Sequence, residues 1–184
     1  KQKNMTREEL EKKYPTEDIL VVDSDWYKDI GHGVHLLTEY EKENLLNEFK
    51  RDTYFRKRKE TEYDPTFLQL IPYVIIKNKE GYFGAKRIDG DVRLKSRFFI
   101  GWGGHINPCD YNWDLFEETF LNNIKRELFK EELHIDLDKT LKLDFKGLIR
   151  FINEEDLISK DHLGLLYVLE TSDDNIKIKE TNSM

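Results

Sequence analysis

Two glutamates in the second half of the chain have the spacing of a metal site. Glu127 and Glu131 are four residues apart in a stretch whose composition favours a helix. Because positions four apart on an α-helix lie one above the other, the two carboxylates would share a face. Stacked carboxylates repel each other unless a cation lies between them, and Mg²⁺ and Mn²⁺ prefer such oxygen ligands. The alternative for so short a pattern is an acidic surface helix exposed to solvent.

The elements around these glutamates would hold them against a sheet. Asp114 and Glu117 look like an N-cap pair that opens a helix over residues 115–133. Gly103 and Gly104 precede this helix, and glycines let the backbone bend tightly and approach a ligand. Apolar residues mark a different side of the helix and would pack it on the sheet: Phe120, Leu121, Ile124 and Leu128.

Residues 103–135 resemble the Nudix box, whose pattern is G, five residues, E, seven residues, R-E-U-x-E-E-x-G-U, with U an apolar aliphatic residue. A glycine pair opens the segment, and Glu118 is followed after seven residues by R-E-L at positions 126–128. The loop ahead of Glu118 is about eight residues longer than the pattern. The likeness extends over roughly residues 67–169, and the phrase G-W-G-G-H-I-N-P is similar to a bacterial subgroup with a longer, degenerate box.

The second half of the box departs from the pattern by one residue. With Arg126 and Glu127 in register, Glu131 falls on the second glutamate of the E-E pair and Lys130 takes the place of the first. Shifting the frame by one residue aligns Glu131 and Glu132 with the E-E pair, but Arg126 and Glu127 then lose their match. One residue too many separates the two halves.

The resemblance implies an α/β/α sandwich with a mixed sheet. It also implies a hydrolase that cleaves a diphosphate linkage in a nucleoside diphosphate derivative with Mg²⁺ or Mn²⁺, an activity on acid anhydrides. The residues that it assigns fall into three groups: the metal ligands Gly103 (through its carbonyl), Glu127, Glu131 and Glu132; the catalytic residues Glu118, Arg126, Glu127 and Glu131; and the substrate contacts Gly104, Arg93 and Trp102.

Several of these roles have alternatives. Glu118 is either another ligand or a base acting through water, and Arg126 would orient a ligating glutamate rather than touch substrate. Trp102 could stack on a base, but packing in the core explains it equally well.

Lys130 is the main argument against catalysis. An ammonium near the ions would weaken metal binding, unless Lys130 turns outward or a helix bulge brings Glu132 into the cluster. The second functional hypothesis is therefore a catalytically impaired module that binds a nucleotide or regulates a partner. A diphosphate isomerase is a distant third, since Cys109 in the box loop is its only hint.

The composition of the chain limits the kinds of molecule that it is expected to bind. The chain has 184 residues with 30 Lys and Arg against 37 Asp and Glu, and its net charge of −7 argues against generic nucleic-acid binding. A basic cluster at 51–59, interleaved with Tyr54 and Phe55, could contact phosphates, or it could be a solvated segment offset by nearby acidic residues. A single cysteine excludes an internal disulfide, and no apolar run is long enough for a membrane span. We expect a cytoplasmic protein, and a homodimer is compatible with these features.

The domain plan has two parts. Residues 1–65 form an N-terminal extension, with a helix, a short strand and a helix, that packs on the main domain; residues 66–184 form the Nudix-like domain. Because the family usually continues into a further strand and a C-terminal helix, we expect a C-terminal truncation or an N-terminal segment that supplies the second helical layer. Apolar runs predict strands at 19–22, 67–76, 82–87, 93–100, 142–151, 162–169 and 176–179.

Overall fold

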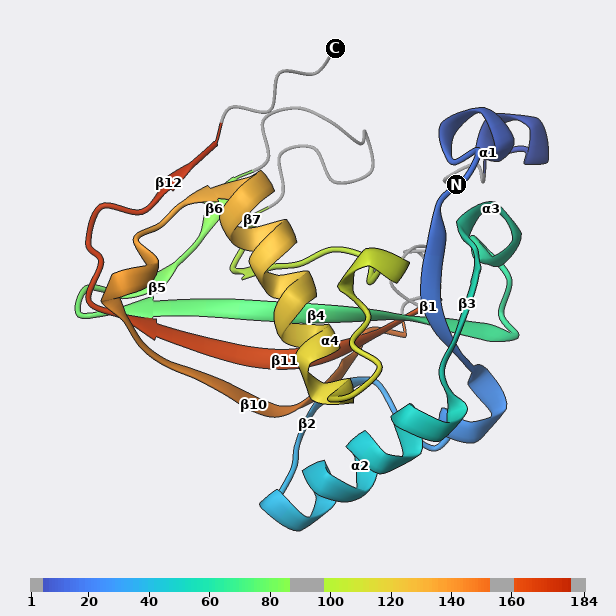
Figure 1. Cartoon of the computed structure of the whole chain (residues 1–184), viewed down its shortest axis with the longest axis horizontal. Helices are drawn as coiled ribbons and strands as arrows, with labels where there is room; N and C mark the ends of the chain where they lie inside the picture. Colours follow the sequence, from blue (N-terminus) through green and yellow to red (C-terminus); the bar gives the residue numbers. More distant parts are fainter. Residues whose placement is uncertain (1–4, 87–97, 153–160, 180–184) are drawn as a thin grey trace.

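The computed structural model describes residues 5–86, 98–152 and 161–179, and it is built on one mixed sheet (Figure 1). Six strands follow the order β2-β10-β11-β4-β1-β3, while β5 and β8 pair with β4 beside this path. The strands of the sheet are β1 (Asp18–Asp23), β2 (Gly33–Leu36), β3 (Tyr54–Lys57), β4 (Phe67–Asn78), β5 (Gly81–Phe83), β8 (Gly101–Trp102), β10 (Thr140–Arg150) and β11 (His162–Thr171).

Two short strand pairs lie outside this sheet. One joins β6 (Ala85–Lys86) to β7 (Phe98–Phe99), and the other joins β9 (Leu133–His134) to β12 (Lys177–Ile178). The second pair follows the helix that carries the glutamates, so it fixes the end of that helix to the late part of the chain.

The centre of the sheet is the parallel pair β4 and β11, and its other pairs are antiparallel. Pro72 lies inside this central strand, paired with Leu165 of β11 on one side. On its other side the partner strand changes, because β1 ends its pairing at Gln69 and β8 begins at Val74. Pro72 occupies the interruption between them, where a missing N–H breaks no ladder bond.

The core lies between the sheet and two helices on one of its faces. The helix α4 (Phe116–Ile124) continues into a π-helical segment, η3 (Lys125–Glu132), and both cross the sheet as Figure 1 shows. The apolar face predicted for this helix is buried, with Phe120, Ile124 and Leu128 each at most 2% exposed. The helix α2 (Glu39–Asp52) contributes Leu45 and Phe49 to the same core.

The N-terminal segment is part of the sheet. Its strand β1 pairs with β4, β3 extends that edge, and β2 forms the opposite edge against β10. A short helix, α1 (Arg7–Lys13), begins at a capping box of Thr6 with Glu9. The segment expected to pack on the main domain thus supplies three strands of its sheet.

The beginning of α4 differs from the prediction. Asp114 and Glu117 do not cap it; the helix begins at Phe116, and its N-cap Leu115 makes no side-chain cap bond. Asn112 instead orders the turn just before the helix, because its Oδ1 accepts hydrogen bonds from the backbone N–H groups of Asp114 and Leu115, both at 3.0 Å. Asn forms such local turns readily, and a spacing rule for N-caps does not detect them.

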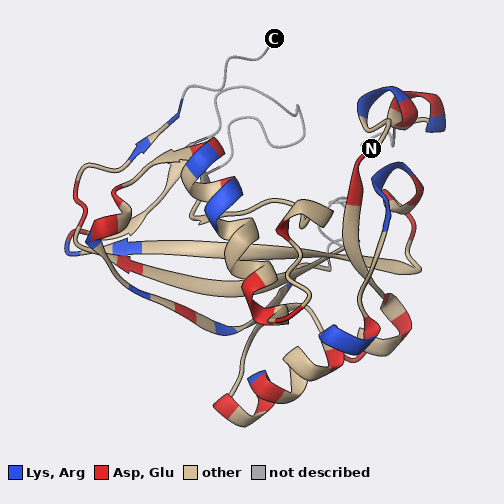
Figure 2. Ribbon diagram, viewed as in Figure 1, with Lys and Arg blue, Asp and Glu red and all other residues tan. Residues whose placement is uncertain are grey.

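The basic cluster at 51–59 lies among acidic residues, as the ribbon coloured by charge shows (Figure 2). Its five cations make ion pairs, which are Arg51–Asp52, Arg56–Glu60, Lys57–Asp18, Arg58 with Glu17 and Glu62, and Lys59–Glu11. These ion pairs favour the interpretation of residues 51–59 as a solvated segment whose charge is offset by nearby acidic residues, over the interpretation that they contact phosphates. In the part of the chain that the structure describes, no helix is long and apolar enough to cross a membrane.

Candidate active site

The helix that carries the glutamates widens where the sequence has its extra residue. From Lys125 to Glu132 the backbone is π-helical. A π-helix bonds residue i to i+5 instead of i+4, so it takes in one more residue than an α-helix over the same turn. Both halves of the box pattern can therefore be matched at once. Arg126 and Glu127 match it before the inserted residue, and Glu131 and Glu132 match it after. The helix bulge considered from the sequence is present.

Lys130 lies on the exposed side of this bulge. Its backbone carbonyl, together with that of Phe129, accepts hydrogen bonds from the Lys179 ammonium, each at 2.7 Å. The outward position of Lys130 removes the main objection that the sequence raised, because its charge is solvated rather than held among the carboxylates.

Gly104 makes room for the carboxylate of Glu127. A Cβ placed on Gly104 would lie 2.7 Å from Oε1 of Glu127 and nearer still to its Cδ and Oε2. Ordinary contact begins at 3.4 Å, so a side chain here and this carboxylate position exclude each other. The glycine pair of the box is thus in contact with the first glutamate of the helix. Gly103 has a different neighbour, because a Cβ there would overlap the carbonyl oxygen of Pro72.

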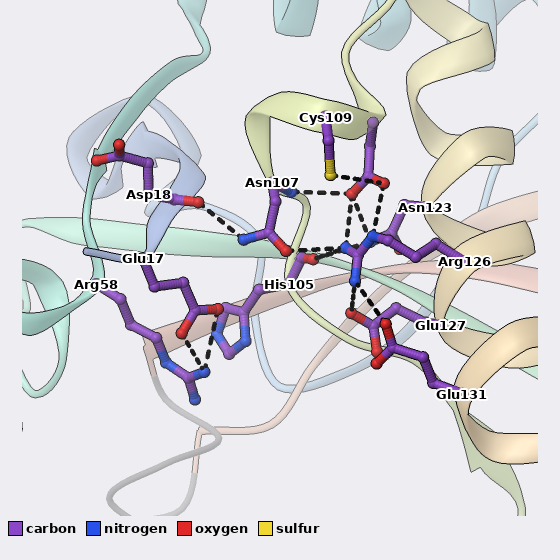
Figure 3. A network of polar contacts seen from close by, with 11 residues as sticks. Glu17, Asp18, Arg58, His105, Asn107, Cys109, Asn123, Arg126, Glu127 and Glu131 are labelled. Atoms are coloured by element: carbon purple, nitrogen blue, oxygen red, sulfur yellow. Dashed lines mark hydrogen bonds and ion pairs between the residues drawn. The ribbon is translucent and has the colours of Figure 1, made fainter. Parts of the chain in front are cut away.

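Arg126 is the centre of a polar network that holds the box loop on the helix (Figure 3). Its guanidinium makes a bidentate pair with Asp110, with Nε to Oδ1 at 2.8 Å and Nη2 to Oδ2 at 2.7 Å. Nη2 also donates to the carbonyl of His105 at 3.0 Å and to Oδ1 of Asn107 at 2.9 Å. Nη1 donates to Glu127 at 2.6 Å and lies 3.6 Å from Glu131. Hydrogen bonding to Asp110 and the charges around it raise the pKa of Arg126 above its usual value.

Asp110 is the buried anchor of this network, with 3% of its surface exposed. It belongs to the short helix η2 (Pro108–Asp110), and it also accepts hydrogen bonds from the backbone N–H of Asn107 and from Nδ2 of Asn123. Burial by itself would raise the pKa of Asp110, but the hydrogen bonds from Arg126, Asn107 and Asn123 outweigh it and lower the pKa. This carboxylate is therefore ionised at neutral pH.

Asp110, Asn107 and Asn123 were not predicted as site residues. The only trace in the sequence is the N-x-x-D spacing after Ile106, which is compatible with a capping box and which the structure shows to be one. A capping box does not indicate that its aspartate faces an arginine sixteen residues later.

The carboxylate of Glu127 has a raised pKa. Burial raises its pKa above the usual value, and the charges of Glu131 and Glu132 raise it further, while Arg126 partly opposes them. Three carboxylates thus act on one another in this region, and each added negative charge makes the buried one harder to ionise. This is the electrostatic situation that a divalent cation relieves.

A metal ion would find suitable donors here, but they are not gathered into a finished cage. Hard carboxylate oxygens of Glu127, Glu131 and Glu132 suit Mg²⁺ or Mn²⁺. Within residues 5–86, 98–152 and 161–179, no group of three His, Cys, Asp or Glu side chains is arranged to hold an ion. Arg126 is drawn to Glu127 and Glu131 instead. The donor chemistry fits a divalent cation, and ligation would require movement of Glu131 or Glu132.

The other predicted residues that the structure describes are Glu118 and Trp102. Glu118 lies in the first turn of α4, nine residues before Glu127 and thus roughly 13 Å away along the helix at about 1.5 Å per residue. Trp102 is 3% exposed and packs between Phe83 and Phe99, with ring centroids at 5.7 and 4.8 Å, which favours the core-packing interpretation over stacking on a base. Arg93 lies outside the described residues.

The mixed sheet, the box helix on its face and the glycine-to-glutamate contact define a protein of the Nudix type. In the solved structures, the chain is similar to Tm1382, a candidate Nudix hydrolase, with a TM-score of 0.65 and 28% identity over 88% of this chain and 84% of that one. This neighbour supports placement of the chain in the Nudix superfamily and a Nudix-type hydrolase in general.

A curated relative matches a shorter stretch. Protein YmaB of Bacillus subtilis (strain 168) is 35% identical over 116 residues, which cover 62% of this chain and 54% of YmaB. The chain thus spans about half the length of this relative. No family model matches the sequence.

Proposed function

We propose that this chain is a divalent-metal-dependent diphosphohydrolase that acts on a nucleoside diphosphate derivative. The observation that carries the proposal is the π-helical turn at Lys125–Glu132. By taking up the extra residue, it lets Arg126-Glu127 and Glu131-Glu132 both keep their places in the box. The shift of frame, which counted against activity, then becomes a local change of helix type.

The residues have distinct tasks in this proposal. Glu127, Glu131 and Glu132 would hold the metal, with the carbonyl of Gly103 as a neutral ligand. Bound there, a divalent cation would neutralise diphosphate oxygens and lower the pKa of a coordinated water. Arg126 orients Glu127 through their hydrogen bond, and Gly104 leaves the space that this carboxylate occupies. Glu118, away from the cluster, is left as a candidate base for a water on the substrate side.

A binding or regulatory module that does not hydrolyse its ligand is the second candidate. It is favoured by the absence, among the described residues, of a ready group of three ligands, and by the ion pair of Arg126 with Glu131 at 3.6 Å. If that ion pair persists in the bound state, Glu131 cannot ligate the cation.

Turnover on a panel of nucleoside diphosphate derivatives, with Mg²⁺, Mn²⁺ or EDTA, distinguishes the two. For a hydrolase we expect metal-dependent release of a nucleoside monophosphate that Glu131→Gln reduces at least about 100-fold, the upper range for removal of an important site group. Glu43→Gln, an exposed glutamate on α2, is the matched control and should not change the rate. Thermal stabilisation by a nucleotide without product would favour the binding module, and metal-dependent turnover that survives Glu131→Gln would refute our ligand assignment.

A further inference from the structure

The long loop between the glycine pair and α4 contains the strongest polar anchor of the site. The loop is fixed at several points, since the backbone N–H of Leu20 donates to the carbonyl of Ile106 at 2.9 Å and Nδ2 of Asn107 donates to the carbonyl of Asp18 at 2.8 Å. Both contacts attach it to β1. The loop therefore carries Asp110 on a rigid support rather than on a mobile excursion.

Asp110 and Arg126 form a bidentate pair on that support. Two parallel hydrogen bonds between a guanidinium and a carboxylate fix the plane and the position of both groups. Asp110 accepts hydrogen bonds from Nε and Nη2 of Arg126, and Nη2 also donates to His105 and Asn107. The remaining nitrogen, Nη1, is the one that is directed to the glutamates.

The charge of Asp110 matters as much as its geometry. Arg126 lies 2.6 Å from Glu127 and 3.6 Å from Glu131, the two carboxylates that the proposed metal site needs. A guanidinium without a counter-charge would be attracted fully to these ligands and would compete with a divalent cation for them. Asp110 supplies the counter-charge from the opposite side, so the Arg126–Asp110 pair is neutral as a unit and the acidic helix face keeps its negative charge.

We propose that Asp110 is a positioning residue that holds Arg126 in place and cancels its charge, and so preserves the affinity of the glutamate cluster for a divalent cation. This inference rests on the proposed function, and it gives the enlarged box loop a specific task. Asp110 would not touch the metal or the substrate; it would act through Arg126 alone.

Mn²⁺ binding to the full chain, followed by the electron paramagnetic resonance signal of the free ion, tests this without any substrate. We expect Asp110→Asn to weaken Mn²⁺ binding by about 10–100-fold, the usual effect of removing a partner of a ligand shell. Asp114→Asn removes an exposed carboxylate from the same loop and should leave the affinity unchanged. In the Arg126→Gln background, Asp110→Asn should add no further loss, because the group through which it acts is gone.

Folding could obscure the first variant, since Asp110→Asn leaves a half-buried guanidinium without its partner. Asn107→Ala keeps both charges and removes one neutral acceptor of Nη2 together with the bond from Asn107 to the carbonyl of Asp18, and we expect up to about tenfold weaker Mn²⁺ binding from bonds of that kind. Unchanged affinity in folded Asp110→Asn, or in Asn107→Ala when Asp110→Asn does not fold, overturns the inference. So does an equal, additional loss in the Arg126→Gln background, which would mean that Asp110 acts independently of Arg126.

Mn²⁺ binding to the wild-type chain distinguishes failure of the proposed function from failure of the role proposed for Asp110. If it binds no Mn²⁺, the proposed function fails and this inference fails with it. If it binds Mn²⁺ and the variants bind equally well, only the role of Asp110 is refuted.

Discussion

Replacing Gly104 by alanine should separate the stability of the fold from the geometry of the site. The new Cβ would lie 2.7 Å from Oε1 of Glu127, where ordinary contact begins at 3.4 Å, so this oxygen must move by at least 0.7 Å (3.4 − 2.7). The other two carboxylate atoms are closer and must move further. The neighbour is the end of a flexible side chain, so Glu127 can rotate away and the fold should remain intact.

The cost should appear in function instead. A displacement near 1 Å at a reacting centre can reduce the rate by about 10²-fold, and it would also break the 2.6 Å bond from Arg126. We therefore expect Gly104→Ala to unfold at nearly the wild-type temperature while metal-dependent turnover falls about 100-fold and Mn²⁺ binding weakens. Thermal unfolding, turnover and an Mn²⁺ titration on the same preparation measure all three.

Gly31→Ala is the matched control, since a Cβ there meets no atom within 4 Å and its φ lies outside the left-handed region. It should change neither stability nor turnover. Wild-type turnover and Mn²⁺ affinity in Gly104→Ala would refute the assignment of Glu127 as a ligand held in this position. Loss of the fold in Gly104→Ala would show that the contact is structural and that the flexible side chain does not yield.

Two further predictions concern the helix. In the absence of divalent cations, Glu127→Gln should raise the free energy of unfolding at neutral pH, because burial and the charges of Glu131 and Glu132 raise the pKa of Glu127 above 4.5, so its ionised form is disfavoured in the fold. This gain in stability should vanish as the pH falls below 4.5, where the carboxyl of Glu127 is protonated in both the folded and the unfolded state. Denaturant unfolding of both proteins at neutral pH and below pH 4.5 measures it. A variant that is less stable than the wild type at neutral pH would contradict the prediction. Deleting Lys130 should convert η3 to an α-helix with the R-E-L-x-E-E spacing. An Mn²⁺ titration should show that the deletion variant still binds the ion. Loss of Mn²⁺ binding would mean that the π-helical turn itself is required.

The local elements of this chain were largely readable from its sequence. Apolar runs predicted the strands β4, β10 and β11, and the apolar periodicity of the box helix predicted α4. Each of these signals depends on residues within a few positions of one another, which is why a single sequence suffices for them. The apolar face of the box helix was predicted for the same reason.

The pairing of the strands was not readable. Residues 1–65 were predicted as an extension with one short strand, yet they contain β1, β2 and β3, with β2 at one edge of the sheet and β3 at the other. Their partners are set by contacts between residues far apart in the sequence, such as Val22 with Leu68, and no local pattern encodes them.

Asp110 was missed for a related reason. An aspartate between a cysteine and a tyrosine in a long loop reads as a solvated turn residue, since isolated charges are rarely buried. Its burial is possible only because Arg126, from a different element, supplies both the counter-charge and two hydrogen bonds. A buried ion pair is a property of two segments in space, so neither segment shows it alone.

The chain departs from the Nudix box by one extra residue in the helix and by a longer loop before it, and the structure accommodates each in a different way. The extra residue is absorbed by a π-helical turn, which leaves Lys130 exposed and the charges of Glu131 and Glu132 acting on Glu127. The extra loop returns to the helix and places a buried carboxylate on Arg126. Glu127 is a half-buried glutamate whose ionised form the fold disfavours, in contact with a glycine that leaves room for it, and this is the arrangement on which our proposed cation site rests. Strain of this kind is typical of sites kept for function rather than stability, and a cation bound at the glutamates would remove it.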